Sequence, residues 1–300
     1  MKITEQLVED VSFYLMTKAC IELPDDVTCA LQRALAAETD PIAVSQLHSI
    51  LQNAEIAKRR QKPICQDTGI PMFYVNYGMN CMAQGDLRAA ITRGTARASD
   101  RVPMRHNVVH PLTLENRRNN TGWGVPVIYW DVIPDSDVLE LTAVPKGFGA
   151  EMRSAHSIVY TSENIKDAVR RCVMDMVEDS MGEPCPPVII GVGVGGLTDS
   201  VMNVAKRSMF RSPVGTRNPD PMVAAMEEEL LSEINALNLG PMGLGGNSYA
   251  LAVNIDVVAS HASTVAIGVS LQCWCSRYST ARIHGDGRVE FLTHPKEAST

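Results

Sequence analysis

The sequence predicts an α/β fold with a helical N-terminal part, on the strength of three features. The 300 residues are 45% hydrophobic and 20% charged, which is enough to bury a full-sized core. Apolar side chains first follow a helical spacing, and short apolar runs then alternate with further helical segments. Two late runs, 250–258 and 265–273, are near-continuously apolar, as in strands covered on both faces. We therefore expect one domain over 1–300, with a helical part at 1–62 and a mixed-sheet α/β core at 63–300.

Three helices are expected in the first sixty residues. Apolar side chains recur every three or four positions in stretches that begin near Ile3, Val27 and Ile42. Pro24 and Pro41 separate these stretches, because proline is tolerated only at the start of a helix.

Strands and helices alternate in the next part of the chain. In order, we expect a strand at 72–77, a helix at 85–99, strands at 125–132 and 138–144, and a helix at 162–181 with Ser162 as its cap. The second and third strands are rich in β-branched and aromatic residues and flank a Pro-Asp-Ser-Asp turn at 134–137. They are therefore expected to form a pair.

The remaining segments continue the alternation. In order, we expect a strand at 187–190, helices at 198–211 and 220–237, strands at 250–258 and 265–273, and a hairpin over 281–292.

A glycine motif, G-x-G-x-x-G at 191–196, lies between a predicted strand and a predicted helix. This spacing is the dinucleotide fingerprint, but that fold needs an acid on a second parallel strand about 20 residues on, which the chain does not offer. A second interpretation is close packing of the helix on the strand. A third is that amides at the helix start hold an anion near Cys185.

Composition and charge exclude several classes of protein. The net charge is −7 and the positive residues are dispersed, so nucleic acid is not an expected partner. Polar residues interrupt the first 23 positions and no run of about 18 apolar residues exists, so neither a signal peptide nor a membrane span is expected. We expect a cytoplasmic protein, in which eight cysteines serve metal binding or packing instead of disulfides.

Three cysteines, Cys65, Cys185 and Cys273, each lie where an apolar element meets a turn. The long separations between them match no local ligand motif, so packing is an alternative on spacing alone. If the fold brings them together, three thiolates would hold a four-iron cluster and leave one iron without a protein ligand. Such an iron is a Lewis acid that binds a hydroxyl and a carboxylate, which indicates a hydro-lyase.

The other cysteines favour different roles. Cys20, Cys29 and Cys172 fall inside helical patterns, where packing is the better interpretation. Cys275 would share a strand face with Cys273, so it could be a fourth ligand or part of a zinc site.

Asp67 is the carboxylate closest in sequence to a candidate ligand. It could relay a proton beside a cluster, or it could cap a turn by accepting a bond from the amide near Gly69. Gln66 is either a substrate donor or a turn residue. His261 follows an apolar strand, where a ring can face a cavity, although a lone histidine there is more often structural.

A dicarboxylate substrate would need cations with fork geometry. Arg105, Arg153 and Arg217 are candidates because each lies in a loop. A glycine-rich turn at 146–149 would let the backbone approach substrate closely, or would simply end a strand. Asn247 and Ser248 would orient a ligand or form a turn.

Several segments together carry a family resemblance. In chain order they are CQDTG at 65–69, RHN at 105–107, KGxGxE at 146–151, CPP at 185–187, GxRxPxP at 215–221, GNS at 246–248, His261, and Cys-Trp at 273–274. They resemble the iron–sulfur-dependent class I fumarate hydratases and the alpha subunits of the related two-subunit L(+)-tartrate dehydratases. The resemblance runs from the first helix to about residue 290. Phe148, where many relatives carry glycine, and Ala262, where proline often follows the histidine, depart from it.

The resemblance implies a fold like the N-terminal domain of class I fumarases and a [4Fe–4S] cluster with one iron lacking a protein ligand. It implies cluster ligands at Cys65, Cys185 and Cys273, in preference to Cys275. It also implies catalytic roles for Asp67 and His261, and substrate contacts from five further residues. These are Gln66, Arg105, Lys146, Gly147 and Gly149.

The activity implied by the resemblance is interconversion of fumarate and (S)-malate. The alternatives are a tartrate dehydratase alpha subunit that makes oxaloacetate and, third, a non-enzymatic iron–sulfur redox or sensing module. Long fumarases of this class carry a further C-terminal domain with arginine, lysine and threonine contributions, whereas this sequence stops at Thr300. The resemblance therefore implies a separately encoded beta subunit, an α2β2 assembly and a small dicarboxylic acid as substrate.

Overall fold

The computed structural model describes residues 2–295, and its contacts divide the chain into two compact units. Unit 1 comprises Met1–Asp25, Asn53–Gly147 and Arg277–Thr300, whereas unit 2 comprises Asp26–Gln52 and Phe148–Ser276. Helices and mixed sheets confirm the predicted α/β class. The single domain predicted over 1–300 stays a prediction, and the helical part at 1–62 divides between the two units.

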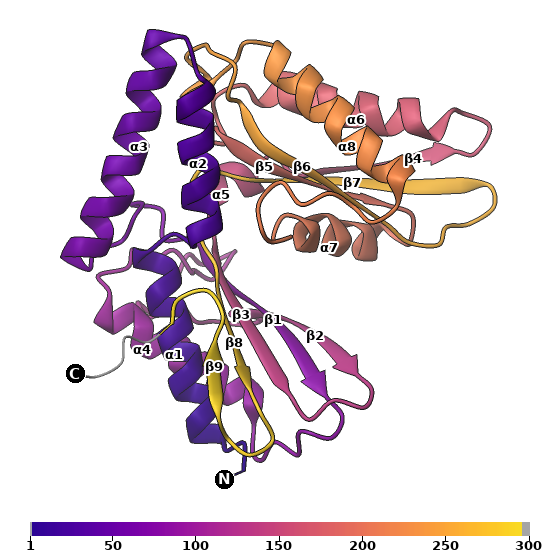
Figure 1. The fold of residues 1–300 in the computed structure, drawn as a ribbon. Coiled ribbons are helices and arrows are strands. Elements are labelled where there is room, and N and C mark those ends of the chain that lie inside the picture. The colour runs from indigo at the N-terminus through magenta and orange to yellow at the C-terminus, as the bar shows by residue number, and fades with distance from the viewer. Residues whose placement is uncertain (1, 296–300) are drawn as a thin grey trace. The chain divides into compact units, whose positions relative to one another are not determined.

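Unit 1 is built on a five-stranded sheet with the strand order β2-β1-β3-β8-β9 (Figure 1). Its strands are β1 (Ile70–Gly78), β2 (Val127–Ile133), β3 (Leu139–Lys146), β8 (Ser279–Ile283) and β9 (Val289–Phe291). The last two pair antiparallel, which confirms the predicted hairpin.

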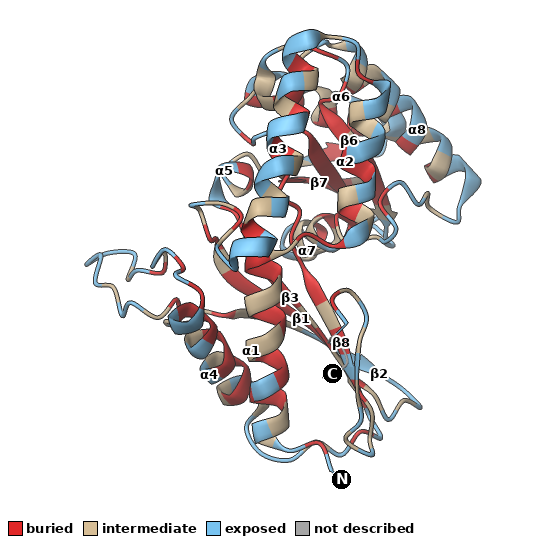
Figure 2. Ribbon diagram, turned by 60° about the vertical axis from the view of Figure 1, so that its left-hand side comes forward, coloured by how far each residue is buried: buried red, intermediate tan, exposed pale blue. Residues whose placement is uncertain are grey.

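Two helices, α1 (Glu5–Ile21) and α4 (Leu87–Arg101), bury apolar side chains against one face of this sheet. Both helices carry buried residues along one side and exposed residues along the other (Figure 2). Gly94 lets them approach closely, because a Cβ there would lie 2.6 Å from the carbonyl oxygen of Glu9. Arg93 then joins the two helices by ion pairs of 2.6 Å to Glu5 and to Glu9.

The predicted pairing of β2 with β3 is wrong, although both strands exist. β1 lies between them, parallel to β2 and antiparallel to β3. The short connection between β2 and β3 therefore crosses the end of β1. Gly78 makes room for this crossing, because a Cβ there would lie 2.5 Å from the carbonyl oxygen of Ser136.

Unit 2 is built on a four-stranded sheet with the order β4-β7-β5-β6. Its strands are β4 (Ala155–Tyr160), β5 (Val188–Val194), β6 (Ala250–Val257) and β7 (Thr264–Gln272). One face is covered by α6 (Ile165–Ser180) and α8 (Pro221–Ala236), and the other by α7 (Thr198–Ser208), as Figure 1 shows. The remaining elements are α2 (Asp25–Ala37), α3 (Pro41–Arg60), α5 (Phe148–Glu151) and the short 3-10 helix η1 (Pro241–Gly243).

Proline positions correctly predicted where two of the helices begin. Pro24 directly precedes α2 and Pro41 opens α3, as predicted. The start of α6 was placed too early, because Asn164 caps this helix by accepting a bond from the Lys166 amide at 3.1 Å.

The glycine motif at 191–196 is a packing device. Gly191 and Gly193 lie inside β5, where a Cβ would come within 2.0 Å of the Ala205 carbonyl oxygen and 2.4 Å of the Val201 carbonyl oxygen. Both oxygens belong to α7, so the missing side chains allow the helix to lie directly on the strand. Among residues 2–295, no helix is both long and apolar enough to cross a membrane.

Candidate functional site

One end of the unit 1 sheet brings several predicted site residues together. A hollow of about 270 Å³ is lined there by Cys65, Gln66 and Arg105, with Pro63, Thr68, Pro103 and Met104 completing its wall. The Thr68 hydroxyl donates to the carbonyl oxygen of Arg105 at 2.9 Å, which fixes the CQDTG turn against the RHN segment. Two motifs about forty residues apart therefore share one surface.

Asp67 lies at the centre of this turn. Its Oδ1 accepts a hydrogen bond from the Gly69 amide at 2.9 Å and a second from Asn107 Nδ2 at 2.9 Å. The turn-capping interpretation of Asp67 is thus confirmed, and a side chain from the RHN segment also orients its carboxylate. Asn107 was missed as a candidate; the RHN motif itself was the available signal.

The KGxG turn lies on the same end of unit 1. Ile70 pairs with Lys146, so the end of β3 lies beside the start of β1. Gly69 has φ of 79°, and a Cβ there would lie 2.7 Å from the Lys146 carbonyl oxygen, so glycine is required. At Gly147, a Cβ would lie 3.5 Å from Asp67 Oδ2. Lys146 and Gly147 therefore adjoin the Asp67 turn, as the predicted substrate-binding role requires.

The unit 2 sheet has two ends with different chemistry. β5 and β6 run parallel and β7 runs antiparallel to them, so the starts of β5 and β6 meet the end of β7. This end, here the cysteine end, carries the loops 181–187, 240–249 and 273–276. The opposite end, here the histidine end, carries the loops 195–197 and 258–263.

Cys185 and Cys273 both lie at the cysteine end. The Trp274 amide donates to the carbonyl oxygen of Cys185 at 3.1 Å, which joins the two cysteine loops. Cys185 has φ of 55°, a left-handed conformation that few non-glycine residues adopt. The structure therefore brings two of the three predicted ligands onto neighbouring loops, whereas Cys65 belongs to unit 1.

Gly149 also lies at the cysteine end, separated from its motif partners. The KGxGxE segment passes from unit 1 to unit 2 after Gly147. A Cβ at Gly149 would lie 3.4 Å from the carbonyl oxygen of Glu183, in the loop of Cys185. The motif glutamate, Glu151, forms an ion pair with Lys206 of α7.

The GNS loop is held from the turn between α2 and α3. Glu38 Oε2 accepts the Asn247 amide at 2.9 Å, and its Oε1 accepts the Thr39 amide at 3.0 Å. Burial by itself raises the pKa of Glu38, but hydrogen bonds from the Ser248 hydroxyl and from backbone amides outweigh it and lower the pKa. Asn247 and Ser248 therefore have a structural task, as the turn interpretation predicted. In the same loop, the Met242 amide donates to the Pro186 carbonyl oxygen at 3.0 Å.

His261 lies at the histidine end, on the loop between β6 and β7. Its Nδ1 accepts the Ser263 amide at 3.2 Å, which places the proton of the neutral ring on Nε2. At roughly 3.3 Å per residue, β7 spans about 26 Å between this loop and Cys273. The structure therefore does not bring His261 together with Cys185 and Cys273 of its own unit.

The start of α7 lies at the histidine end as well, because this helix follows the end of β5. The idea that its amides hold an anion beside Cys185 is therefore wrong. The order of the elements explains this. Cys185 lies just before β5, and α7 begins only after β5 has run to the opposite end of the sheet.

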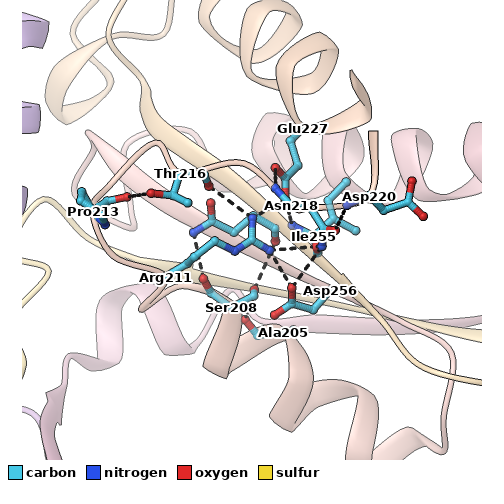
Figure 3. A network of polar contacts seen from close by, with 11 residues as sticks. Ala205, Ser208, Arg211, Pro213, Thr216, Asn218, Asp220, Glu227, Ile255 and Asp256 are labelled. Atoms are coloured by element: carbon cyan, nitrogen blue, oxygen red, sulfur yellow. Dashed lines mark hydrogen bonds and ion pairs between the residues drawn. The ribbon is translucent and has the colours of Figure 1, made fainter. Parts of the chain in front are cut away.

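The other two candidate arginines, Arg153 and Arg217, do not line the hollow of Cys65, Gln66 and Arg105. Arg153 forms an ion pair with Glu183, whose hydrogen bond raises the arginine pKa. Arg217 lies in a loop held by the neighbouring Arg211, which reaches between Glu227 and Asp256 at 2.6 Å from each carboxylate (Figure 3). Glu227 is fully buried, and its Oε1 also accepts the Ile255 amide at 2.7 Å. Arg105 is therefore the candidate with the most direct place in the site.

Exposure alone does not separate the candidate ligands from the other cysteines. Cys185 is exposed and Cys65 and Cys273 are half-buried, but Cys29 is exposed and Cys172 half-buried as well. Cys20 and Cys275 are buried, and burial raises the pKa of Cys20 to about 11, as expected of a packing residue. Within residues 2–295, no three His, Cys, Asp or Glu side chains are gathered as a metal site. Thiolates are the soft donors of an iron–sulfur cluster, and the neighbouring loops of Cys185 and Cys273 support the ligand set.

Comparison with known proteins gives a consistent result. The model of the family described as "Fumarate hydratase (Fumerase)" matches residues 9–282. The chain is 37% identical over 285 residues to the "Putative L(+)-tartrate dehydratase subunit alpha" of Methanocaldococcus jannaschii, covering 94% of this chain and 99% of that protein. It is 33% identical over 276 residues to the L(+)-tartrate dehydratase subunit alpha of Escherichia coli, covering 92% and 90%. These matches confirm the resemblance found from the motifs: the chain belongs to the fumarate hydratase (Fumerase) family.

Proposed function

We propose that this chain is the alpha subunit of an iron–sulfur hydro-lyase that interconverts fumarate and (S)-malate. The observation that carries the proposal is the hollow where Cys65, Gln66 and Arg105 meet beside the Asp67 turn. A candidate metal ligand, an amide donor and a cation for a carboxylate share one surface there. This combination suits a small hydroxy acid that must be bound at both its carboxylate and its reacting carbon.

Cys65, Cys185 and Cys273 would hold a [4Fe–4S] cluster. When bound, the cluster would supply a Lewis acid, because three cysteines leave one of its four irons without a protein ligand. In the described part of the chain none of the eight cysteines forms a disulfide bond, which suits a reducing compartment, and we propose the cytoplasm.

The residues of unit 1 have separable tasks in this proposal. The exposed Arg105 guanidinium binds a substrate carboxylate through two parallel hydrogen bonds, and Gln66 donates a further bond. Lys146 and Gly147, together with Gly149 of unit 2, bring the backbone close to the substrate. Asp67, oriented by Asn107 and the Gly69 amide, gives or takes a proton at the reacting centre.

We propose that His261 also takes part in these proton transfers, provided that it comes from another subunit. It lies across the unit 2 sheet from Cys185 and Cys273, so a histidine of the same unit does not reach a site built on the cysteine end. We therefore propose that His261 serves the site of a second alpha subunit. An α2β2 assembly, with the beta subunit supplying the remaining cations, would provide this arrangement.

L(+)-tartrate is the second candidate substrate, because the relatives from Methanocaldococcus jannaschii and Escherichia coli carry tartrate dehydratase names. The KGFGAE segment, which is closer to the fumarase pattern, favours fumarate. (S)-Malate and L(+)-tartrate differ by one hydroxyl, so a site that binds this hydroxyl would reject the other acid strongly.

The test is coexpression with the candidate beta subunit, anaerobic purification, and assay with fumarate, (S)-malate, mesaconate and both tartrates. We expect turnover of fumarate and (S)-malate by the pair, and very little by residues 1–300 alone. Turnover of L(+)-tartrate in their place would replace fumarate by the second candidate. Full turnover by the isolated chain would contradict the proposed division between subunits.

A further inference from the structure

Arg277 is the largest fully buried side chain of residues 2–295, with 1% of its surface exposed. Removing a guanidinium from water costs several kcal/mol, on the order of a whole domain's stability, unless hydrogen bonds replace the lost water. A residue with this cost therefore has partners that repay it. None of the sequence motifs singled it out.

Arg277 donates hydrogen bonds to two backbone carbonyls from separate parts of unit 1. Its Nε donates to the Pro145 carbonyl oxygen at 3.1 Å, and its Nη2 donates to the carbonyl oxygen of Asp67. The first oxygen belongs to the end of β3, and the second to the CQDTG turn. The planar fork of arginine spans both at once, which the single ammonium of lysine does not reproduce.

The Asp67 carboxylate and the Arg277 guanidinium both border Gly147. A Cβ placed on Gly147 would lie 3.5 Å from Asp67 Oδ2 and 3.7 Å from Arg277 Nη2. The Asp67 Oδ1 is meanwhile bound by the Gly69 amide and by Asn107. Arg277 thus acts on the main chain of Asp67 while the other donors act on its side chain.

We infer that Arg277 is a positioning residue, which fixes the peptide plane of Asp67 and thereby the direction of its carboxylate. This inference rests on the proposed function only where it concerns turnover. Arg277 follows Cys273 by four residues, so one short segment carries a proposed cluster ligand and the anchor of the proposed proton carrier. Loss of the fork would leave one of two buried carbonyls without its donor, and the turn would relax toward other partners.

The test compares Arg277→Lys, which keeps the charge, with Arg282→Lys as the matched control. Arg282 lies on β8, which begins two residues after Arg277, and its exposed side chain binds Glu140 at 2.7 Å. Hydrogen exchange of the full chain is followed at residues 63–69, with β1 and β3 as internal references. In Arg277→Lys, we expect exchange at the Gly69 amide to rise about tenfold or more while β1 keeps its protection. Arg282→Lys should match the wild type.

The second measurement is turnover with the beta subunit. We expect Arg277→Lys to lower kcat by about tenfold to a hundredfold with KM within about twofold and cluster content unchanged, because the carboxylate is misplaced while the substrate contacts stay. Unchanged exchange at Gly69, or equal loss of protection throughout unit 1, overturns the anchor. A loosened turn with normal kcat overturns the positioning role and leaves the proposed function standing. If the wild type proves to have no hydro-lyase activity, the proposed function fails and the exchange result still decides the anchor.

Discussion

The two ends of the unit 2 sheet are formed by the same strands but carry different kinds of residues. At the cysteine end, three loops are tied to one another by backbone hydrogen bonds, and they present Cys185 and Cys273 as accessible thiols. At the histidine end, glycines bring α7 onto β5 and a short loop exposes His261. The glycine motif, which has the more familiar sequence pattern, belongs to packing. The candidate metal ligands lie at the cysteine end, where the sequence pattern is less conspicuous.

The largest effect should come from the ligands at the cysteine end. Cys185→Ser and Cys273→Ser, like Cys65→Ser in unit 1, should each lose the cluster entirely, because each removes one of only three proposed ligands. Iron and sulfide content of anaerobically prepared protein measures this directly. Cys275→Ser is the control, since Cys275 is buried two residues from Cys273 and should change little. A full cluster in the Cys185 variant would remove the difference between the two ends.

A second prediction tests whether the two ends meet between subunits. His261→Asn should keep its cluster and lose turnover by about 10²-fold, the usual size of a lost general acid or base. Mixing His261→Asn with Cys185→Ser chains before assembly should restore about a quarter of wild-type activity, because half of randomly formed pairs contain one intact site out of two. No recovery on mixing, with dissociation and reassembly verified by tagged chains, would contradict the shared site.

A third prediction compares a glycine-to-alanine substitution toward each end of the unit 2 sheet. Gly193→Ala should lower the free energy of unfolding by about 3 kcal/mol, because its Cβ would lie 2.4 Å from the backbone oxygen of Val201. Gly149→Ala should keep its stability, since its Cβ would lie 3.4 Å from the Glu183 oxygen, and should lose activity instead. Urea unfolding and steady-state kinetics separate the two. Equal destabilisation of both variants would show that the ends do not differ in this way.

The smallest effect concerns the Glu38 contact with the GNS loop. The folded state lowers the pKa of Glu38, so its contribution to stability is present above the unfolded value and is lost as the pH falls through the folded value. Glu38→Gln should therefore cost about 1–2 kcal/mol at pH 7 and much less in acid. Urea unfolding across pH 3–7 measures this, with the exposed Glu55→Gln as control. A cost independent of pH would assign the effect to packing.

Much of the fold follows from local sequence, and the exceptions have physical causes. Periodicity and proline positions predict the helices and strands, because these signals act within a few residues. The pairing of β2 with β3 was wrong because no local signal reports that β1 lies between them. In the same way, the start of α6 depended on which of several polar residues caps it.

The candidate site was predictable to the extent that its residues lie in recognisable motifs. CQDTG and RHN do adjoin in unit 1, and the loops of Cys185 and Cys273 adjoin in unit 2. The position of His261 was not accessible, because it depends on strand direction across a whole sheet. Arg277 was missed for a related reason, since the Pro145 and Asp67 carbonyl oxygens that it binds are backbone groups, which no side-chain pattern reports.

The network around Arg211 has a consequence for the behaviour of the protein in concentrated solution. β6 is an outermost strand of its sheet, and such strands can recruit a strand from another molecule. At Ile255 the amide is bound by Glu227, and the carbonyl accepts from Arg211 at 3.0 Å and from Asn218 at 2.8 Å. At Ile255, the backbone groups that would template intermolecular pairing are thus already occupied. Loss of Glu227 would expose them, and its first symptom would be aggregation on storage or heating.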